Sequence, residues 1–180
     1  MVLFSCSFRE KHFIYSHGAI VRGDTAAKEI ALVFTGDEFG DGGTFISEIL
    51  KKENIKASFF LTGNFYRNKE FGPVIKDLLK NGNYLGSHSD RHLLYCDWTK
   101  RDSLLVSRRE FNLDLDNSYF EMEKFGIKRD EAGFFLPPYE WYNDSIASWT
   151  NNSGLRLVNF TGGTRSNADY TYPRDGGSVY

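Results

Sequence analysis

Short apolar segments alternate with helical segments from residue 29 onward, and this alternation leaves few possible folds. Parallel strands joined by helical crossovers produce this order along a chain. We therefore predict an α/β fold whose functional loops follow the carboxyl ends of the strands. The predicted strands are 29–34, 57–61, 84–87, 134–136 and 155–160. Four helices are predicted. The first runs through residues 45–50, with Thr44 as a possible cap, and the second spans 71–80. The third is opened by a capping box at Ser107 and ends at Gly126, and the fourth spans 144–152.

The size and charge of the chain exclude several classes of protein. With 180 residues, the chain is long enough for one domain with a packed core. Its net charge is -2 and it has no basic block, so we expect no nucleic-acid partner. No apolar run approaches the roughly 20 residues needed for a transmembrane helix. The sequence does not indicate an oligomeric state.

Residues 1–27 lack a clear period, so we interpret them as a lead-in or tail before a domain at 28–180. The apolar start ending at Cys6 resembles the tail of a bacterial lipoprotein signal. Either this is an ordinary N-terminus, or the start lies within a longer lipoprotein signal. The second alternative predicts an extracytoplasmic protein, periplasmic or lipid-anchored through Cys6.

Two of the four histidines lie four residues apart, directly after the third predicted strand. His88 and His92 would face Asp37 and Glu38, which follow the first strand, because the loops at one end of a parallel barrel converge. Two imidazoles and one carboxylate form a typical open site for a divalent metal. The alternative is that the histidines are surface or capping residues and that the acids belong to a turn.

Several motifs carry a family resemblance. The stretches GNYLGSHSDRH (82–92), KASFFLTGNF (56–65), FLPPYEWYN (135–143) and LRLVNF (155–160) occur in the order and spacing of one family. The region from Ile30 to Leu157 resembles the polysaccharide deacetylases, carbohydrate esterase family 4. This resemblance implies a distorted (β/α) barrel and a divalent metal, with Zn²⁺ as the expected ion, held by His88 and His92. It also implies an acetylated carbohydrate as substrate.

The first motif departs from the family pattern T-F-D-D-G. Thr35 and Gly36 stand in the two Asp positions, and two acids follow directly after them. We assign Asp37 as the third metal ligand, with a share in catalysis, and Glu38 as the base that takes a proton from the attacking water. Leu136 stands where the third motif of the family has Arg.

Further site residues follow from the later motifs. In the family, the backbone N–H corresponding to Tyr139 helps to hold the developing oxyanion, and we assign Tyr139 that role. Trp141 and Tyr142 could stack on a sugar or be core aromatics. Arg165 and Asp169 could line the mouth and replace the missing Arg–Asp pairing, or lie in a solvated loop.

The final family motif, L-x-H, is absent before the chain ends at Tyr180. We therefore expect a barrel that is incomplete at its C-terminus and that lacks the general acid of the family. The predicted function is a metal-dependent hydrolase that removes acetyl groups from a carbohydrate, cleaving a carbon–nitrogen bond other than a peptide bond. The 180-residue chain could itself be an inactive fragment. The alternatives are a catalytically impaired carbohydrate-binding protein on the same scaffold and another metal-dependent amide hydrolase.

Overall fold

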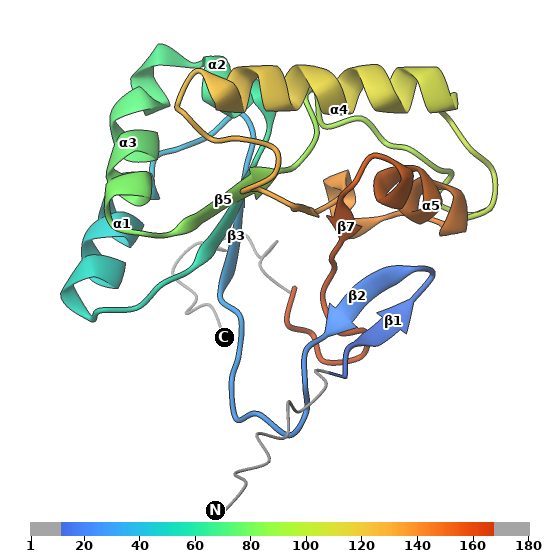
Figure 1. Ribbon diagram of the computed structural model, residues 1–180, viewed down its shortest axis with the longest axis horizontal. Helices are drawn as coiled ribbons and strands as arrows, with labels where there is room; N and C mark the ends of the chain where they lie inside the picture. The colour runs from blue at the N-terminus through green and yellow to red at the C-terminus, as the bar shows by residue number, and fades with distance from the viewer. Residues whose placement is uncertain (1–11, 168–180) are drawn as a thin grey trace, which may run out of the picture.

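A parallel five-stranded sheet organises the computed structural model, which describes residues 12–167 (Figure 1). Its strands lie side by side in the order of the sequence, so each crossover leads to the neighbouring strand. The α/β architecture with parallel strands is therefore confirmed. The strands are β3 (Val33–Gly36), β4 (Ser58–Leu61), β5 (Tyr84–Ser87), β6 (Phe134–Phe135) and β7 (Arg156–Leu157).

Helices fill the connections between the strands. In Figure 1, α1 and α3 lie on one side of the sheet, α5 lies on the other side, and α4 crosses one end. The helices are α1 (Gly43–Lys52), α2 (Gly63–Arg67), α3 (Gly72–Lys80), α4 (Arg108–Glu123) and α5 (Asp144–Asn152), with 3₁₀ turns η1 (Lys69–Phe71) and η2 (Pro138–Glu140). The core packs apolar faces of these helices against the sheet. No helix within residues 12–167 is long and apolar enough to cross a membrane.

Two helix starts were predicted with different success. The capping box of α4 is confirmed, because the Glu110 amide donates to Ser107 Oγ and the Ser107 amide donates to Glu110 Oε2. For α1, the possible cap at Thr44 is wrong. That helix begins at Gly43 with Gly42 as its N-cap and no side-chain cap, so Thr44 already lies in its first turn.

Strand β3 ends two residues later than predicted. Thr35 and Gly36 pair with Phe60 and Leu61 in the parallel ladder, and the chain leaves the sheet only after Gly36. The loop that follows β3 therefore starts at Asp37. This places the two acids of the loop directly at the carboxyl end of the edge strand β3, beside the ends of β4 and β5.

A β-hairpin lies within the segment interpreted as a lead-in. Strands β1 (Ile14–Ser16) and β2 (Ala19–Arg22) pair in antiparallel fashion, and Ala19 is fully buried. Ile20 forms a parallel bridge with Val158, so the hairpin extends the sheet beyond β7. The two strands contain no apolar run as long as those at 29–34 and 57–61, which is why the sequence did not reveal them. The division at residue 28 remains a prediction.

Candidate metal and active site

His88 is buried at the carboxyl end of β5, where its tautomer is set by the backbone. Its Nδ1 lies 2.8 Å from the carbonyl oxygen of Leu136, so Nδ1 carries the proton and donates it. The Nε2 lone pair is then available to a ligand. Burial, with a smaller contribution from His92, lowers the pKa of His88 to about 4. His88 is therefore a neutral imidazole at neutral pH.

His92 lies beside His88 on the turn that follows the strand. The two ring centroids are 5.0 Å apart. The His92 amide donates to Ser89 Oγ, and its φ of 56° holds the residue in the left-handed region. Burial lowers the pKa of His92 as well, although Asp37 opposes this shift. Both imidazoles are therefore in the form that can bind a metal ion.

Asp37 and Glu38 face the histidines across one cavity. Asp37 Oδ1 accepts hydrogen bonds from Thr62 Oγ1 at 2.7 Å and from Asn64 Nδ2 at 3.2 Å. These donors fix one carboxylate oxygen, whereas the Glu38 side chain is exposed to solvent. The cavity has a volume of about 290 Å³ and is lined by Thr35, Gly36, Asp37, Glu38, Phe39, His88 and His92. The structure thus brings together the four residues predicted to lie at the mouth.

The chemical types of these side chains suit a divalent transition metal. Two neutral imidazoles and a carboxylate are typical ligands of catalytic zinc, and the His88 bond to a backbone carbonyl is a typical outer-shell contact. Within residues 12–167, however, no three His, Cys, Asp or Glu side chains are close enough to hold an ion together. The histidine pair is in place, and the third ligand is not.

A buried acid on α4 anchors the turn that carries the histidines. Asp114 accepts hydrogen bonds from the amides of Asp90 and Arg91, both at 3.1 Å, and from the Tyr95 hydroxyl at 2.9 Å. Its side chain is buried at the face of α4 that contacts this turn. The sequence analysis missed it, although an Asp on the apolar face of an amphipathic helix is a signal, because buried acids require partners.

Close contacts on the other side fix the same turn. Asp90 accepts from Arg67 Nη1 at 2.5 Å, and the amide of Gly63 donates to the Ser89 carbonyl. A Cβ atom at Gly63 would lie 1.9 Å from Asp90 Oδ1, so only glycine allows this approach. The turn is therefore held from α2 as well as from α4.

The aromatic residues of the third motif divide between surface and core. Tyr139 is 45% exposed, and its ring centroid lies 4.5 Å from that of His92. Trp141 is partly buried and donates from Nε1 to the Asp97 carbonyl. Tyr142 is buried, and its hydroxyl donates to the Ser16 carbonyl of the hairpin. Its ring and its hydroxyl are both used in packing, which favours the core alternative for Tyr142 over a sugar contact.

The fourth-motif residues lie outside the cavity or outside the described chain. Arg165 is exposed in the turn after β7, with a φ of 56°, and Thr161 in this turn donates to the Val21 carbonyl of β2. Its role as a sugar contact remains a prediction. Asp169 and Cys6 lie outside the described residues.

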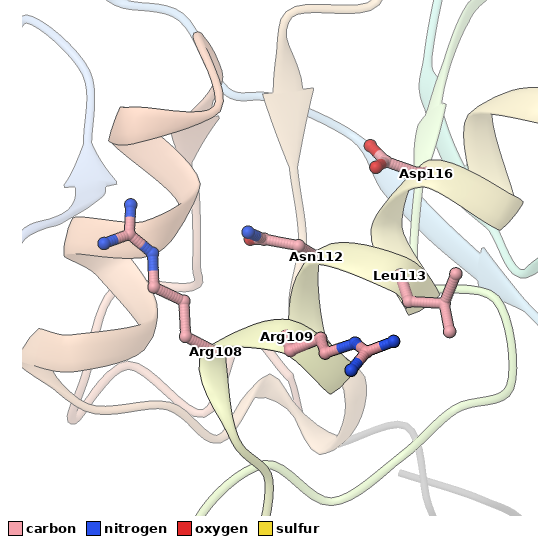
Figure 2. A pocket seen from close by; sticks show the side chains of 5 residues that line it. All are labelled: Arg108, Arg109, Asn112, Leu113 and Asp116. Carbon is pink, nitrogen blue, oxygen red and sulfur yellow. The ribbon is translucent and has the colours of Figure 1, made fainter.

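A second, larger hollow lies against α4 (Figure 2). It has a volume of about 580 Å³ and is lined by Arg108, Arg109, Asn112, Leu113 and Asp116. These residues all come from one helix, and Asp116 is already paired with Arg129. None of the predicted site residues is among them, so the histidine cavity is the candidate site.

A parallel α/β fold with paired histidines and acids at its strand ends is the class of protein that the structure defines. Residues 22–158 match the polysaccharide deacetylase family. The match covers most of the chain, so the protein belongs to this family, whose deacetylases are hydrolases. The family assignment made from the motifs is thereby confirmed.

Individual relatives agree with this assignment. The chain is 24% identical over 145 residues to the peptidoglycan-N-acetylmuramic acid deacetylase PdaA of Bacillus subtilis, covering 81% of this chain and 51% of PdaA. A family 4 carbohydrate esterase from Bacillus anthracis superposes with a TM-score of 0.67 at 24% identity, covering 79% of this chain and 63% of that one. These likenesses confirm the fold class, a distorted (β/α) barrel. The chain spans about half the length of the curated relatives that it matches.

One structural relative bears on activity. A family 4 pseudoenzyme from Bacillus anthracis superposes with a TM-score of 0.59 at 23% identity, covering 81% of this chain and 47% of that one. The same fold therefore occurs in a protein described as a pseudoenzyme.

Proposed function

We propose that this protein is a metal-dependent hydrolase that removes acetyl groups from a carbohydrate. The observation that carries the proposal is the pair of neutral histidines facing two acids in one cavity at the strand ends. Family membership supports the reaction class, since the family is one of deacetylases. The relation to a peptidoglycan deacetylase supports a site of action outside the cytoplasm.

The residues would take the following parts. His88 through Nε2, His92 and Asp37 would hold a divalent ion, with Zn²⁺ as the expected metal. When bound, such an ion lowers the pKa of a water ligand to about 7 and polarises a carbonyl. Thr62 and Asn64 fix Asp37 Oδ1 by hydrogen bonds, and Asp37 would move closer to the histidine pair to complete the ligand set.

The remaining roles fall to Glu38 and Tyr139. The Glu38 carboxylate takes a proton from the water that attacks the acetyl carbonyl carbon. The Tyr139 N–H is the first backbone donor after the two prolines, and it donates to the oxygen on which negative charge develops. Trp141 and Arg165, together with Asp169, are proposed to contact the sugar.

Acetate release tests this proposal. The full chain, with zinc added, should release acetate from acetylated oligosaccharides, and Glu38→Gln should reduce the rate by at least about 100-fold because the proton acceptor is lost. Asp37→Ala should abolish both tight metal binding and turnover. A rate of acetate release that is unchanged in both variants would refute the assigned roles.

A second candidate function is carbohydrate binding without turnover. It is favoured by the lack of a three-ligand group within residues 12–167 and by Gly36 in a position where the family has Asp. In that case the protein would bind oligosaccharides but release no acetate at any zinc concentration. Acetate release that depends on Glu38 would exclude it.

A further inference from the structure

A row of aromatic rings continues from the histidine pair along the surface. Tyr139 contacts His92, and the ring of Trp98 lies 5.5 Å from Tyr139 and 5.6 Å from Trp141, measured between centroids. Trp98 comes from the long connection before α4, whereas Tyr139 and Trp141 come from the loop after β6. Two separate segments therefore place their rings side by side next to the cavity.

The row is exposed where a ligand could reach it. Trp98 is 54% exposed and Tyr139 is 45% exposed. A large aromatic side chain normally lies buried, because leaving it in water forfeits about 1.5–3 kcal/mol. Adjacent exposed aromatics beside a polar cavity are typical of a binding surface.

The connection that carries Trp98 is held in place by its own hydrogen bonds. Asp97 Oδ1 accepts from the amides of Thr99 and Lys100, both at 2.8 Å, and the Asp97 amide donates to the Ser103 carbonyl. The Asp97 carbonyl also accepts from Trp141 Nε1. The rings are thus presented by a fixed backbone, which lowers the entropic cost of binding.

Trp141 supports the row from behind. The Arg101 guanidinium lies over its ring at 3.8 Å from the centroid, so one face of this indole is already covered. Trp141 therefore supports Trp98 from behind and can offer a sugar only a small part of its ring. The larger exposed aromatic surfaces are those of Trp98 and Tyr139.

We propose that Trp98 and Tyr139 form a sugar-binding subsite next to the histidine cavity. The C–H groups on one face of a pyranose ring fit an aromatic face, and the ring hydroxyls stay in water at its edge. The subsite would hold a second sugar ring of an oligosaccharide while the acetylated ring lies at His88 and His92. This inference rests on the proposed function in that its ligand is the same class of carbohydrate.

Calorimetric titration of the metal-free full chain tests the subsite. The probes are tetra-N-acetylchitotetraose and the single sugar N-acetylglucosamine. Wild-type protein should bind the tetrasaccharide more tightly, and Trp98→Ala should weaken that binding about tenfold, or about 1.4 kcal/mol. The same variant should leave monosaccharide binding unchanged. Trp98→Phe keeps a flat ring and should recover most of the loss.

Phe120→Ala is the matched control, because it removes a similarly exposed aromatic ring: Phe120 on α4 is 62% exposed. It should bind both probes as wild type does. Tetrasaccharide binding that is equal in wild type and Trp98→Ala, or undetectable in wild type, would overturn the subsite. Acetate release plays no part in this measurement. The subsite can therefore stand if the enzyme assay fails, and can fall if that assay succeeds.

Discussion

Several residues of the site hold backbone angles that side chains rarely adopt. Ser89, His92, Tyr139 and Glu140 all have positive φ, between 50° and 75°. Each such residue costs on the order of 1–3 kcal/mol relative to an unstrained backbone. His92 lines the cavity and Tyr139 contacts its ring, and the hydrogen bonds to Asp114 and Ser89 Oγ hold the histidine turn against this cost. Strain gathered at one place is typical of a functional site.

Burial of neutral His88 predicts a pH dependence of stability in the metal-free protein. The folded pKa of about 4 lies below the unfolded value of about 6.5, so the unfolded chain binds more protons between these values. The free energy of unfolding should therefore be fully supported above pH 6.5 and fall, by up to about 3 kcal/mol, as the pH drops toward 4. Urea titrations across this range measure it. His88→Asn keeps a donor for the Leu136 carbonyl and should flatten the curve; an unaltered curve would contradict the assignment.

Gly36 cannot be returned to the family residue without cost. A Cβ atom there would lie 2.8 Å from Leu61 Cδ2 and 3.0 Å from the Phe65 ring. Gly36→Asp should therefore lower the free energy of unfolding by about 1–3 kcal/mol. Thr35→Asp, on the exposed side of the same strand, is the matched control and should change it by less than about 1 kcal/mol. Denaturant midpoints compare the two, and equal midpoints would count against the crowding at Gly36.

At the scale of elements, α4 acts as a support for the histidine turn. Its buried Asp114 gathers three donors, whereas Asp116 on the exposed side pairs only with Arg129. The same helix therefore packs on the core and also fixes the turn that carries the histidines. The turn should depend on α4 as much as on β5, from which it emerges.

Asp114→Ala should damage both stability and metal binding. It leaves two amides and the Tyr95 hydroxyl without their acceptor, which should cost about 3 kcal/mol of unfolding free energy. Zinc affinity should fall about 10- to 100-fold, as for other outer-shell partners. Asp116→Ala is the control, because loss of an exposed ion pair costs at most about 1 kcal/mol. Unchanged zinc affinity in a folded Asp114→Ala protein would show that α4 does not position the histidines.

The regular elements could be predicted from the sequence, and the supports of the site could not. Strand β5 and helix α5 lie at their predicted residues, because apolar spacing and caps are local signals. The end of β3 was missed because its pairing with β4 overrides the turn preference of Thr35 and Gly36. Hairpin β1–β2 was missed because it lacks a long apolar run, and the partners of Asp114 and Tyr142 lie far away in sequence. His88 and His92 were found because their spacing is local.

At the scale of the whole molecule, one side of the described sheet exposes apolar groups. Ile30, Val33 and Phe39 lie along β3 and its connections, and Phe45 and Ile49 lie on the outer face of α1. Within residues 12–167, β3 is hydrogen-bonded to β4 on one edge only. Such an edge beside apolar side chains promotes association between chains.

Polar substitutions on this face should improve solubility without loss of stability. The pair Phe45→Lys and Ile49→Lys should reduce light scattering at high protein concentration and shift the melting temperature little, because both side chains already lie in water. Leu113→Lys on the exposed face of α4 is the control and should leave scattering unchanged. A large drop in melting temperature for the pair would show instead that the face is packed.

The central claim is that His88 and His92 bind a metal ion, and metal content tests it most directly. Purified protein comprising residues 1–180, incubated with zinc and freed of excess, should retain about one equivalent. His88→Ala and His92→Ala should each lose it, whereas His17→Ala, at an exposed histidine paired with Asp144, should keep it. A folded wild-type protein that retains no zinc, or two histidine variants that retain it fully, would contradict the account.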